Sequence, residues 1–115
     1  MKIAFAFCIL FLSLTMHAQE SLTGVWNMGQ DNTKIKITEG KGIYEGRIAS
    51  SDNADVKIGN LILKEVKLVD GKWKGKMYAP KKQEWFDAIL KVEGKQLLVT
   101  VKSGWASQTL KWSKE

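Results

Sequence analysis

Leu22-Thr23-Gly24-Val25-Trp26-Asn27 is the stretch that decides the fold, because it places a glycine two residues before a tryptophan at the head of many short apolar runs. In the first strand of a small closed barrel, a glycine lets another backbone come close to a buried indole. We therefore predict that Trp26 plugs a barrel, and that the segments after it are further strands.

The rest of the chain has the composition of strands and turns. It contains one proline and ten glycines, and no window has a sustained helical period. The predicted strands after the first cover residues 33–38, 43–50, 61–69, 72–79, 85–92, 95–102 and 107–113. The fold class predicted is all-β, an eight-stranded antiparallel up-and-down barrel, whose interior either is filled by side chains or holds one small ligand.

Alternation along each strand separates the inward side chains from the outward ones. Many of the predicted inward side chains are large, which favours a mostly filled interior. The predicted inward residues are Trp26, Tyr44, Gly46, Ile48, Ile62, Val66, Leu68, Trp73, Gly75, Met77, Phe86, Ala88, Leu90, Val92, Leu110 and Trp112.

The first 18 residues read as a secretory signal peptide. Lys2 gives a positive start, an apolar run follows, and Ala18 is a small residue before a polar segment. The apolar run is too short for a membrane span, which needs about 20 residues. We expect cleavage after Ala18, a single barrel domain over residues 19–115, and a soluble product in the periplasm or outside the cell, with no transmembrane segment in the mature chain.

Removal of this leader takes away the only cysteine, Cys8, and the only histidine, His17. The mature chain then has no thiol nucleophile, Ser-His-Asp triad, disulfide or Cys/His zinc site. We predict that it is not an enzyme and uses no cofactor.

Charge argues against a nucleic-acid partner. Loss of Lys2 leaves 17 basic residues against 12 acidic ones, a formal charge of +5, and Arg47 is the one arginine. Nucleic-acid readers usually depend on arginine for bidentate contacts. The lysines fit the outer face of a sheet, where they deter edge-to-edge aggregation, with weak binding of an anionic polymer as the alternative.

The predicted turns differ between the two ends of the barrel. Three acid-Gly-Lys copies, at 39–41, 70–72 and 93–95, suit tight hairpins, and an up-and-down order places them all at one end. The connections at 27–32, 51–60, 80–84 and 103–106 are less regular and gather at the other end. We expect a ligand to enter at that loop end.

Three motifs together resemble a known family: the Gly-x-Trp start, the segment at 73–80 and the closing segment at 109–114. The chain resembles small secreted bacterial proteins catalogued as a domain of unknown function, although Lys114 stands where that family usually has arginine and the turn at 80–83 lacks the family's glycine. The start is also similar to that of lipocalins, which implies a calycin-like barrel in which Lys111 or Lys114 stacks on Trp26.

Several loop-end residues are candidates for binding. Trp85 and Phe86 are adjacent, so one points outward; we expect this to be Trp85, as a contact platform or as a cover for lysine stems. Trp105 either stacks on a ligand, caps the mouth or folds into the barrel. The candidate ligand-binding set is Trp105, Trp85, Lys81, Lys82, Asp52 and Asn53.

Metal and hydrolase chemistry fit the sequence less well. The oxygen ligands of Asp52, Asn53 and Asp55 suit calcium, but their spacing does not match an EF-hand loop. No feature orients Asp52, Asp55, Glu84 and Asp87 into the carboxylate pair of a glycosidase. We predict no metal site.

Two functions remain open from sequence alone. The first is binding of a small polar or amphipathic ligand, such as a glycan fragment or lipid headgroup, at the loop end. The second is an envelope interaction or structural protein with a filled barrel that acts through its lysine-rich wall. The volume of the interior decides between them.

Overall fold

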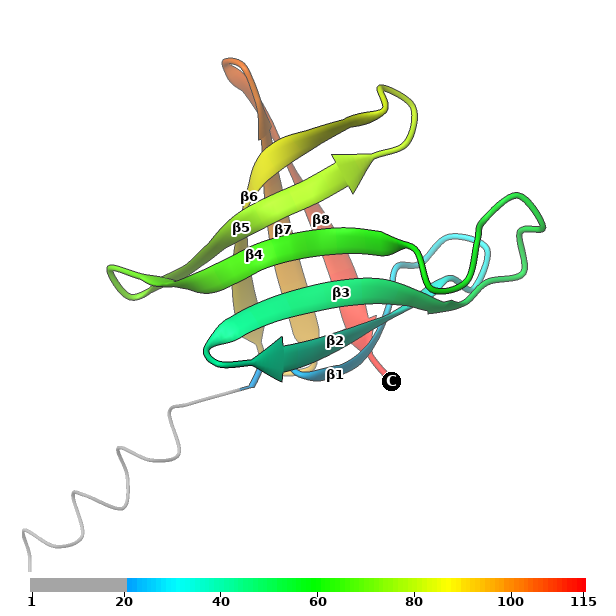
Figure 1. Ribbon diagram of the computed structural model, residues 1–115, viewed down its shortest axis with the longest axis horizontal. Coiled ribbons are helices and arrows are strands. Elements are labelled where there is room, and N and C mark those ends of the chain that lie inside the picture. Colours follow the sequence, from blue (N-terminus) through cyan, green and yellow to red (C-terminus); the bar gives the residue numbers. More distant parts are fainter. Residues whose placement is uncertain (1–20) are drawn as a thin grey trace, which may run out of the picture.

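The computed structural model describes residues 21–115, which form a closed antiparallel barrel of eight strands in up-and-down order (Figure 1). The strands are β1 (Gly24–Asn27), β2 (Lys34–Gly40), β3 (Ile43–Ser50), β4 (Leu61–Val69), β5 (Lys72–Ala79), β6 (Glu84–Glu93), β7 (Gln96–Ser103) and β8 (Ala106–Lys114). The predicted all-β barrel is confirmed, with strand ends shifted by a residue or two. The predicted leader, residues 1–18, lies outside the described residues. Among those that are described, no helix is long and apolar enough to cross a membrane.

The turns joining β2 to β3, β4 to β5 and β6 to β7 lie at one end of the barrel, as predicted. Gly71 and Gly94 make their turns at positive φ, +78° and +62°. The first copy differs, because Gly40 is still part of β2 and the turn is made by Lys41 and Gly42. The repeated acid-Gly-Lys motif therefore marks three hairpins but not one common turn geometry.

The half of the barrel next to these turns contains the most deeply buried side chains, and we call it the packed half. Its side chains come from all eight strands and from the segment before β1. The most deeply buried are Leu22, Trp26, Ile35, Leu63, Val66, Ala88, Leu97, Val99 and Trp112, each at most 1% exposed.

Trp26 is buried in the barrel as the sequence predicts, and Lys114 lies over its ring next to Gly24. The indole is fully buried, and its Nε1 donates a hydrogen bond of 2.9 Å to the backbone oxygen of Leu22. Lys114 Nζ lies 5.0 Å from the ring centroid. A Cβ on Gly24 would lie 3.1 Å from that ammonium. Gly24 thus makes room for the Lys114 side chain and not for the neighbouring backbone that we predicted. Of the two lysines predicted to stack on Trp26, Lys114 is the one that does so.

A bulge in β4 overturns part of the predicted alternation. Between Lys64 and Lys67 the pairing with β5 shifts by a residue, and Glu65 has φ +54°. Leu63 and Val66 are both buried although they are three residues apart, and Leu68, predicted to face the core, is 58% exposed beside the β4–β5 turn. Period-two alternation fails between Leu63 and Val66 because the bulge adds one residue to the strand. Leu68 keeps the same face as Val66, opposite Trp73, and is exposed because it lies at the end of the strand next to the turn.

Gly75 lies across from this bulge. A Cβ at Gly75 would lie 2.5 Å from Val66 Cγ2 and 2.8 Å from the backbone oxygen of Lys64. The bulged backbone therefore occupies the space that a side chain would need, which is the reason for a glycine inside a strand.

Candidate functional site

The other half of the barrel is hollow. A cavity of about 890 Å³ opens between the loops at that end, and we call it the loop-end cavity. The count of large inward side chains predicted a mostly filled interior. Many of those side chains gather in the packed half and leave this cavity open at the loop end. The apolar side chains that line the loop-end cavity include Met28, Ile48, Ile62, Met77, Phe86, Val101 and Leu110.

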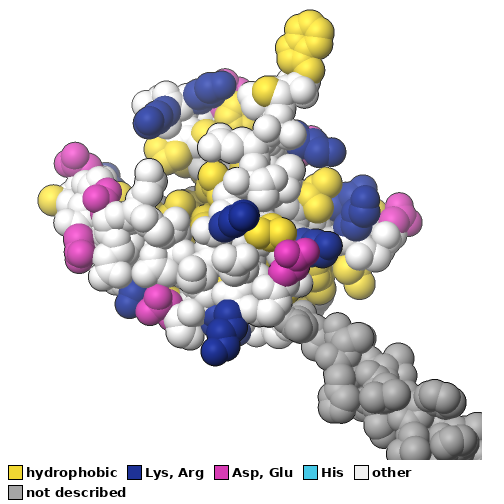
Figure 2. Space-filling view, turned by 180° about the vertical axis from the view of Figure 1, so that it is seen from behind, with side chains coloured by type: hydrophobic (Ala, Val, Ile, Leu, Met, Phe, Trp, Pro, Cys, Tyr) yellow, Lys and Arg dark blue, Asp and Glu magenta, His cyan; other side chains and the backbone are white. Residues whose placement is uncertain are grey.

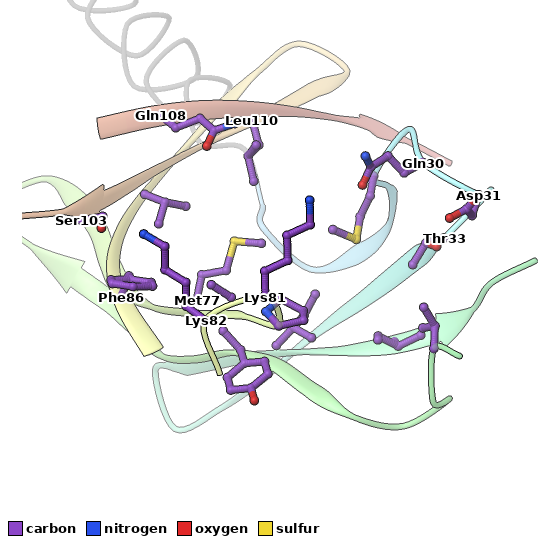
Figure 3. A pocket seen from close by; sticks show the side chains of 18 of the residues that line it. Gln30, Asp31, Thr33, Met77, Lys81, Lys82, Phe86, Ser103, Gln108 and Leu110 are labelled. Carbon is purple, nitrogen blue, oxygen red and sulfur yellow. The ribbon is translucent and has the colours of Figure 1, made fainter. Parts of the chain in front are cut away.

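Polar and charged groups line the rim of the cavity. Lys81 and Lys82 come from the β5–β6 turn and extend toward β8, where Gln108 and Leu110 lie (Figure 3). Asp31, from the β1–β2 loop, lies on the far side (Figure 3). The cavity thus combines an apolar interior with a rim that is basic on one side and acidic on the other.

Hydrogen bonds join the two loops on the acidic side. The hydroxyl of Thr33, which is 6% exposed, lies 2.7 Å from the hydroxyl of Ser51. The backbone amide of Asp52 donates to the backbone oxygen of Asp31 at 2.8 Å, and Asn53 Nδ2 donates to its carboxylate at 3.3 Å. These hydrogen bonds hold the β1–β2 and β3–β4 loops together on this side of the rim.

The basic side is built differently. The β5–β6 turn is closed by backbone bonds from Lys82 to Ala79 and from Gln83 to Pro80. Lys82 Nζ lies 5.6 Å from the centroid of the Phe86 ring, above the cavity lining. Within residues 21–115, Lys81 and Lys82 form no ion pair. Both ammonium groups are free to meet an anionic group at the mouth.

The structure brings together only part of the predicted site. Lys81, Lys82 and Asn53 line the cavity, whereas Asp52 does not and neither tryptophan of the set does. Sequence reasoning missed Asp31 on the acidic rim, considered Asp55 only for metal or hydrolase chemistry, and did not assign the apolar lining to a site. The apolar lining could have been predicted. Alternation placed Met77, Phe86 and Leu110 inward, and their positions along the strands put them near the loop end.

Trp85 points outward as predicted, and Phe86 lines the cavity. The Trp85 ring packs on Tyr78 at 5.3 Å between centroids, and Lys64 Nζ lies 4.3 Å from its centroid. Trp85 therefore covers a lysine on the barrel wall and takes no part in the loop-end cavity.

Trp105 is at the tip of the hairpin between β7 and β8, in a two-residue turn with Gly104. Its relative exposure is 103%, so the hypothesis that it folds into the barrel is wrong. It does not line the cavity, although Ser103 and Ala106 on either side of the turn do. The hairpin projects beyond the rest of the barrel (orange in Figure 1).

Charged side chains on the outer wall pair with one another. Lys76 Nζ lies 2.9 Å from a carboxylate oxygen of Asp87. Their hydrogen bond raises the pKa of Lys76 and lowers the pKa of Asp87. Figure 2 shows lysine and acidic side chains scattered over one face with apolar patches between them. Within the described part of the chain, no three His, Cys, Asp or Glu side chains are grouped to hold a metal ion.

The end of the barrel with the three tight turns also has a hollow. Its volume is about 1010 Å³, and it is open to one side. Tyr44 and Trp73 meet edge to face within it, with ring centroids 4.9 Å apart. Leu68, exposed by its place beside the turn, lies on its wall.

Comparison with known proteins adds no family. No protein-family model matches the chain, and no curated protein matches it. The resemblances drawn from the sequence motifs stay predictions, and function has to be argued from the loop-end cavity.

Proposed function

We propose that the protein binds a small amphipathic molecule, with its apolar part in the loop-end cavity and an anionic group between Lys81 and Lys82. The observation that carries this proposal is an apolar-lined cavity of about 890 Å³ that opens beside two lysines without ion-pair partners in the described chain. Pockets for small molecules usually measure about 300–1,000 Å³.

The lining supports an apolar ligand body. Met77, Phe86 and Leu110 face the space from three different strands, and Met28 adds a flexible, polarisable side chain from the β1–β2 loop. An apolar chain or ring that displaces water from these side chains gains about 25 cal/mol per Å² buried.

The rim supports an anionic head group. Two ammonium groups on flexible stems can both turn toward a carboxylate or phosphate, and charge-assisted hydrogen bonds are stronger than neutral ones. Asp31 and Asp55 on the opposite rim disfavour a second anionic group there, so a ligand with one charged end fits better than a dianionic one.

The proposal is for binding without catalysis, outside the cytoplasm. The predicted leader supports export, and the mature sequence has neither cysteine nor histidine to act as nucleophile or base. The cavity supports this proposal over the alternative function, which assumes a filled barrel.

The test is titration of the purified protein with a fluorescent fatty acid, with the corresponding fatty alcohol as the uncharged comparison. Leu110→Trp places a larger ring in the cavity and should weaken both ligands. Lys81→Gln with Lys82→Gln should weaken the acid about five- to tenfold and the alcohol little.

A matched control comes from the neighbouring position on the same strand. Lys111→Trp adds the same side chain to the outer face of β8 and should leave both affinities unchanged. Undiminished binding of the probes to Leu110→Trp would place the ligand outside the cavity. If neither the fatty acid nor the fatty alcohol binds the wild-type protein, an amphipathic ligand of this kind is refuted.

A further inference from the structure

Trp105 is the most exposed large apolar side chain in residues 21–115. The others are Ile58 at 61%, Leu68 at 58% and Ile43 at 46% exposure, whereas the indole of Trp105 has no cover at all. Its position at the tip of a two-residue turn between two paired strands holds it away from the barrel. The projecting end at the top of Figure 2 terminates in an apolar side chain that nothing on that face covers.

The β7–β8 hairpin stands on the basic side of the rim. Lys102 precedes the turn on β7 and pairs in register with Asp87 of β6, whose carboxylate also binds Lys76. Lys81 and Lys82 lie on the neighbouring β5–β6 turn, with Glu84 as the acidic residue there. The opposite side has the reverse balance, with Asp31, Asp52 and Asp55 against Lys57. The two sides of the mouth thus differ in the sign of their charge.

We infer that this edge docks on an anionic lipid bilayer, with the Trp105 indole in the interfacial region and the neighbouring lysines over the headgroups. Tryptophan favours the membrane interface because its ring is apolar and its N–H is polar. Lysines near an anionic bilayer each add about 1 kcal/mol of attraction, and the acidic side of the rim is repelled.

Docking in this orientation places the mouth of the loop-end cavity beside the bilayer, since Ser103 and Ala106 belong both to the hairpin and to the cavity wall. The inference goes beyond the proposed function and does not depend on it, because it rests on the outside of the hairpin. If both hold, the ligand enters from the membrane and not from bulk water.

The experiment is flotation of the purified protein with vesicles of phosphatidylcholine containing about 30% phosphatidylglycerol, compared with pure phosphatidylcholine. Binding should require the anionic lipid and should fall with salt. Trp105→Ser should weaken partitioning about tenfold. Lys102→Gln should weaken it by a smaller factor and only on the anionic vesicles.

Two variants make the outcome specific. Trp105→Phe keeps an apolar side chain but removes the indole that fluoresces. Flotation should therefore largely persist, whereas the blue shift that vesicles cause in the tryptophan emission of the wild-type protein should disappear. Ile58→Ser changes an exposed apolar residue on the acidic side and should have no effect. Equal loss with Ile58→Ser would overturn the assigned edge, and no flotation of the wild-type protein would overturn membrane docking altogether.

The soluble fatty-acid titration separates this inference from the proposed function. Trp105→Ser should bind the fluorescent fatty acid like the wild type, because the indole does not line the cavity. A protein that floats with vesicles but binds no fatty acid would retain the docking surface and lose the ligand proposal. If Trp105→Ser lost fatty-acid binding and vesicle flotation together, the hairpin would belong to the ligand site and the separate docking surface would be refuted.

Discussion

The packed half and the loop-end cavity belong to the same barrel, yet one is rich in fully buried side chains and the other is open. In the packed half, Trp26, Trp112, Leu97 and Val99 are almost fully buried members of one hydrophobic cluster. At the other end, Phe86 and Leu110 line the wall without closing the space. The buried core and the open cavity therefore lie at opposite ends of one barrel, so substitutions at the two ends should have different consequences for stability.

The largest effect should come from Trp26. Trp26→Ala removes a fully buried indole, its hydrogen bond to Leu22 and the ring under Lys114, and should lower the free energy of unfolding by about 3–5 kcal/mol. Urea denaturation followed by circular dichroism measures this change. Trp105→Ala is the matched control and should stay within about 0.5 kcal/mol. A near-neutral Trp26→Ala would show that the plug does not support the packed half.

A leucine from each half gives the most direct comparison. Leu97 is fully buried and pairs with Trp112, so Leu97→Ala should cost about 2–5 kcal/mol through a new internal cavity. Leu110 is half-buried and faces space that is already open, so Leu110→Ala should cost about 1 kcal/mol. The same denaturation experiment measures both. Equal costs would mean that the loop-end cavity is closed in solution.

Much of the barrel follows from the sequence, because alternation and turn residues act locally. The eight strands, the three tight hairpins at one end and the burial of Trp26 need only neighbouring residues to be recognised. The β4 bulge does not, since Glu65 has a backbone conformation that no local signal marks, and Gly75 is explained only by the bulged backbone opposite it. For this reason the burial of Leu63 was not predicted.

The candidate site was harder to predict than the fold. Lys81 and Lys82 could be placed at the mouth because their turn follows a well-marked strand. Trp105 could not, since its orientation depends on a turn of only two residues that leaves no room to fold back. The cavity itself depends on how large side chains are distributed along the barrel axis, and a count of inward residues carries no such information.

The smallest effect should appear at the seam that closes the barrel, where β1 and β8 pair at only two positions. Glu115, just beyond β8, accepts a hydrogen bond of 3.0 Å from Lys34 Nζ and one of 3.2 Å from Asn27 Nδ2. These bonds, chiefly that from Lys34, hold the pKa of the Glu115 side chain below its ordinary value. Because the carboxylate is favoured in the folded state, its contribution to stability is present above the ordinary pKa of about 4.3 and is lost as the pH falls through the lowered folded value.

Glu115→Gln should therefore destabilise a protein untagged at its C-terminus at pH 6–7, and the difference from wild type should vanish on acidification below the folded pKa. Hydrogen exchange should quicken in β1, since the backbone amide of Glu115 also donates to Val25 at 3.0 Å. Asp87→Asn is the comparison, because its ion pair with Lys76 has the same sign of pH dependence but joins β5 and β6, which pair along seven positions. Its loss should leave exchange in β1 unchanged. A Glu115→Gln difference that is as large at pH 2.5 as at pH 7 would show that the carboxylate's charge does not hold the seam.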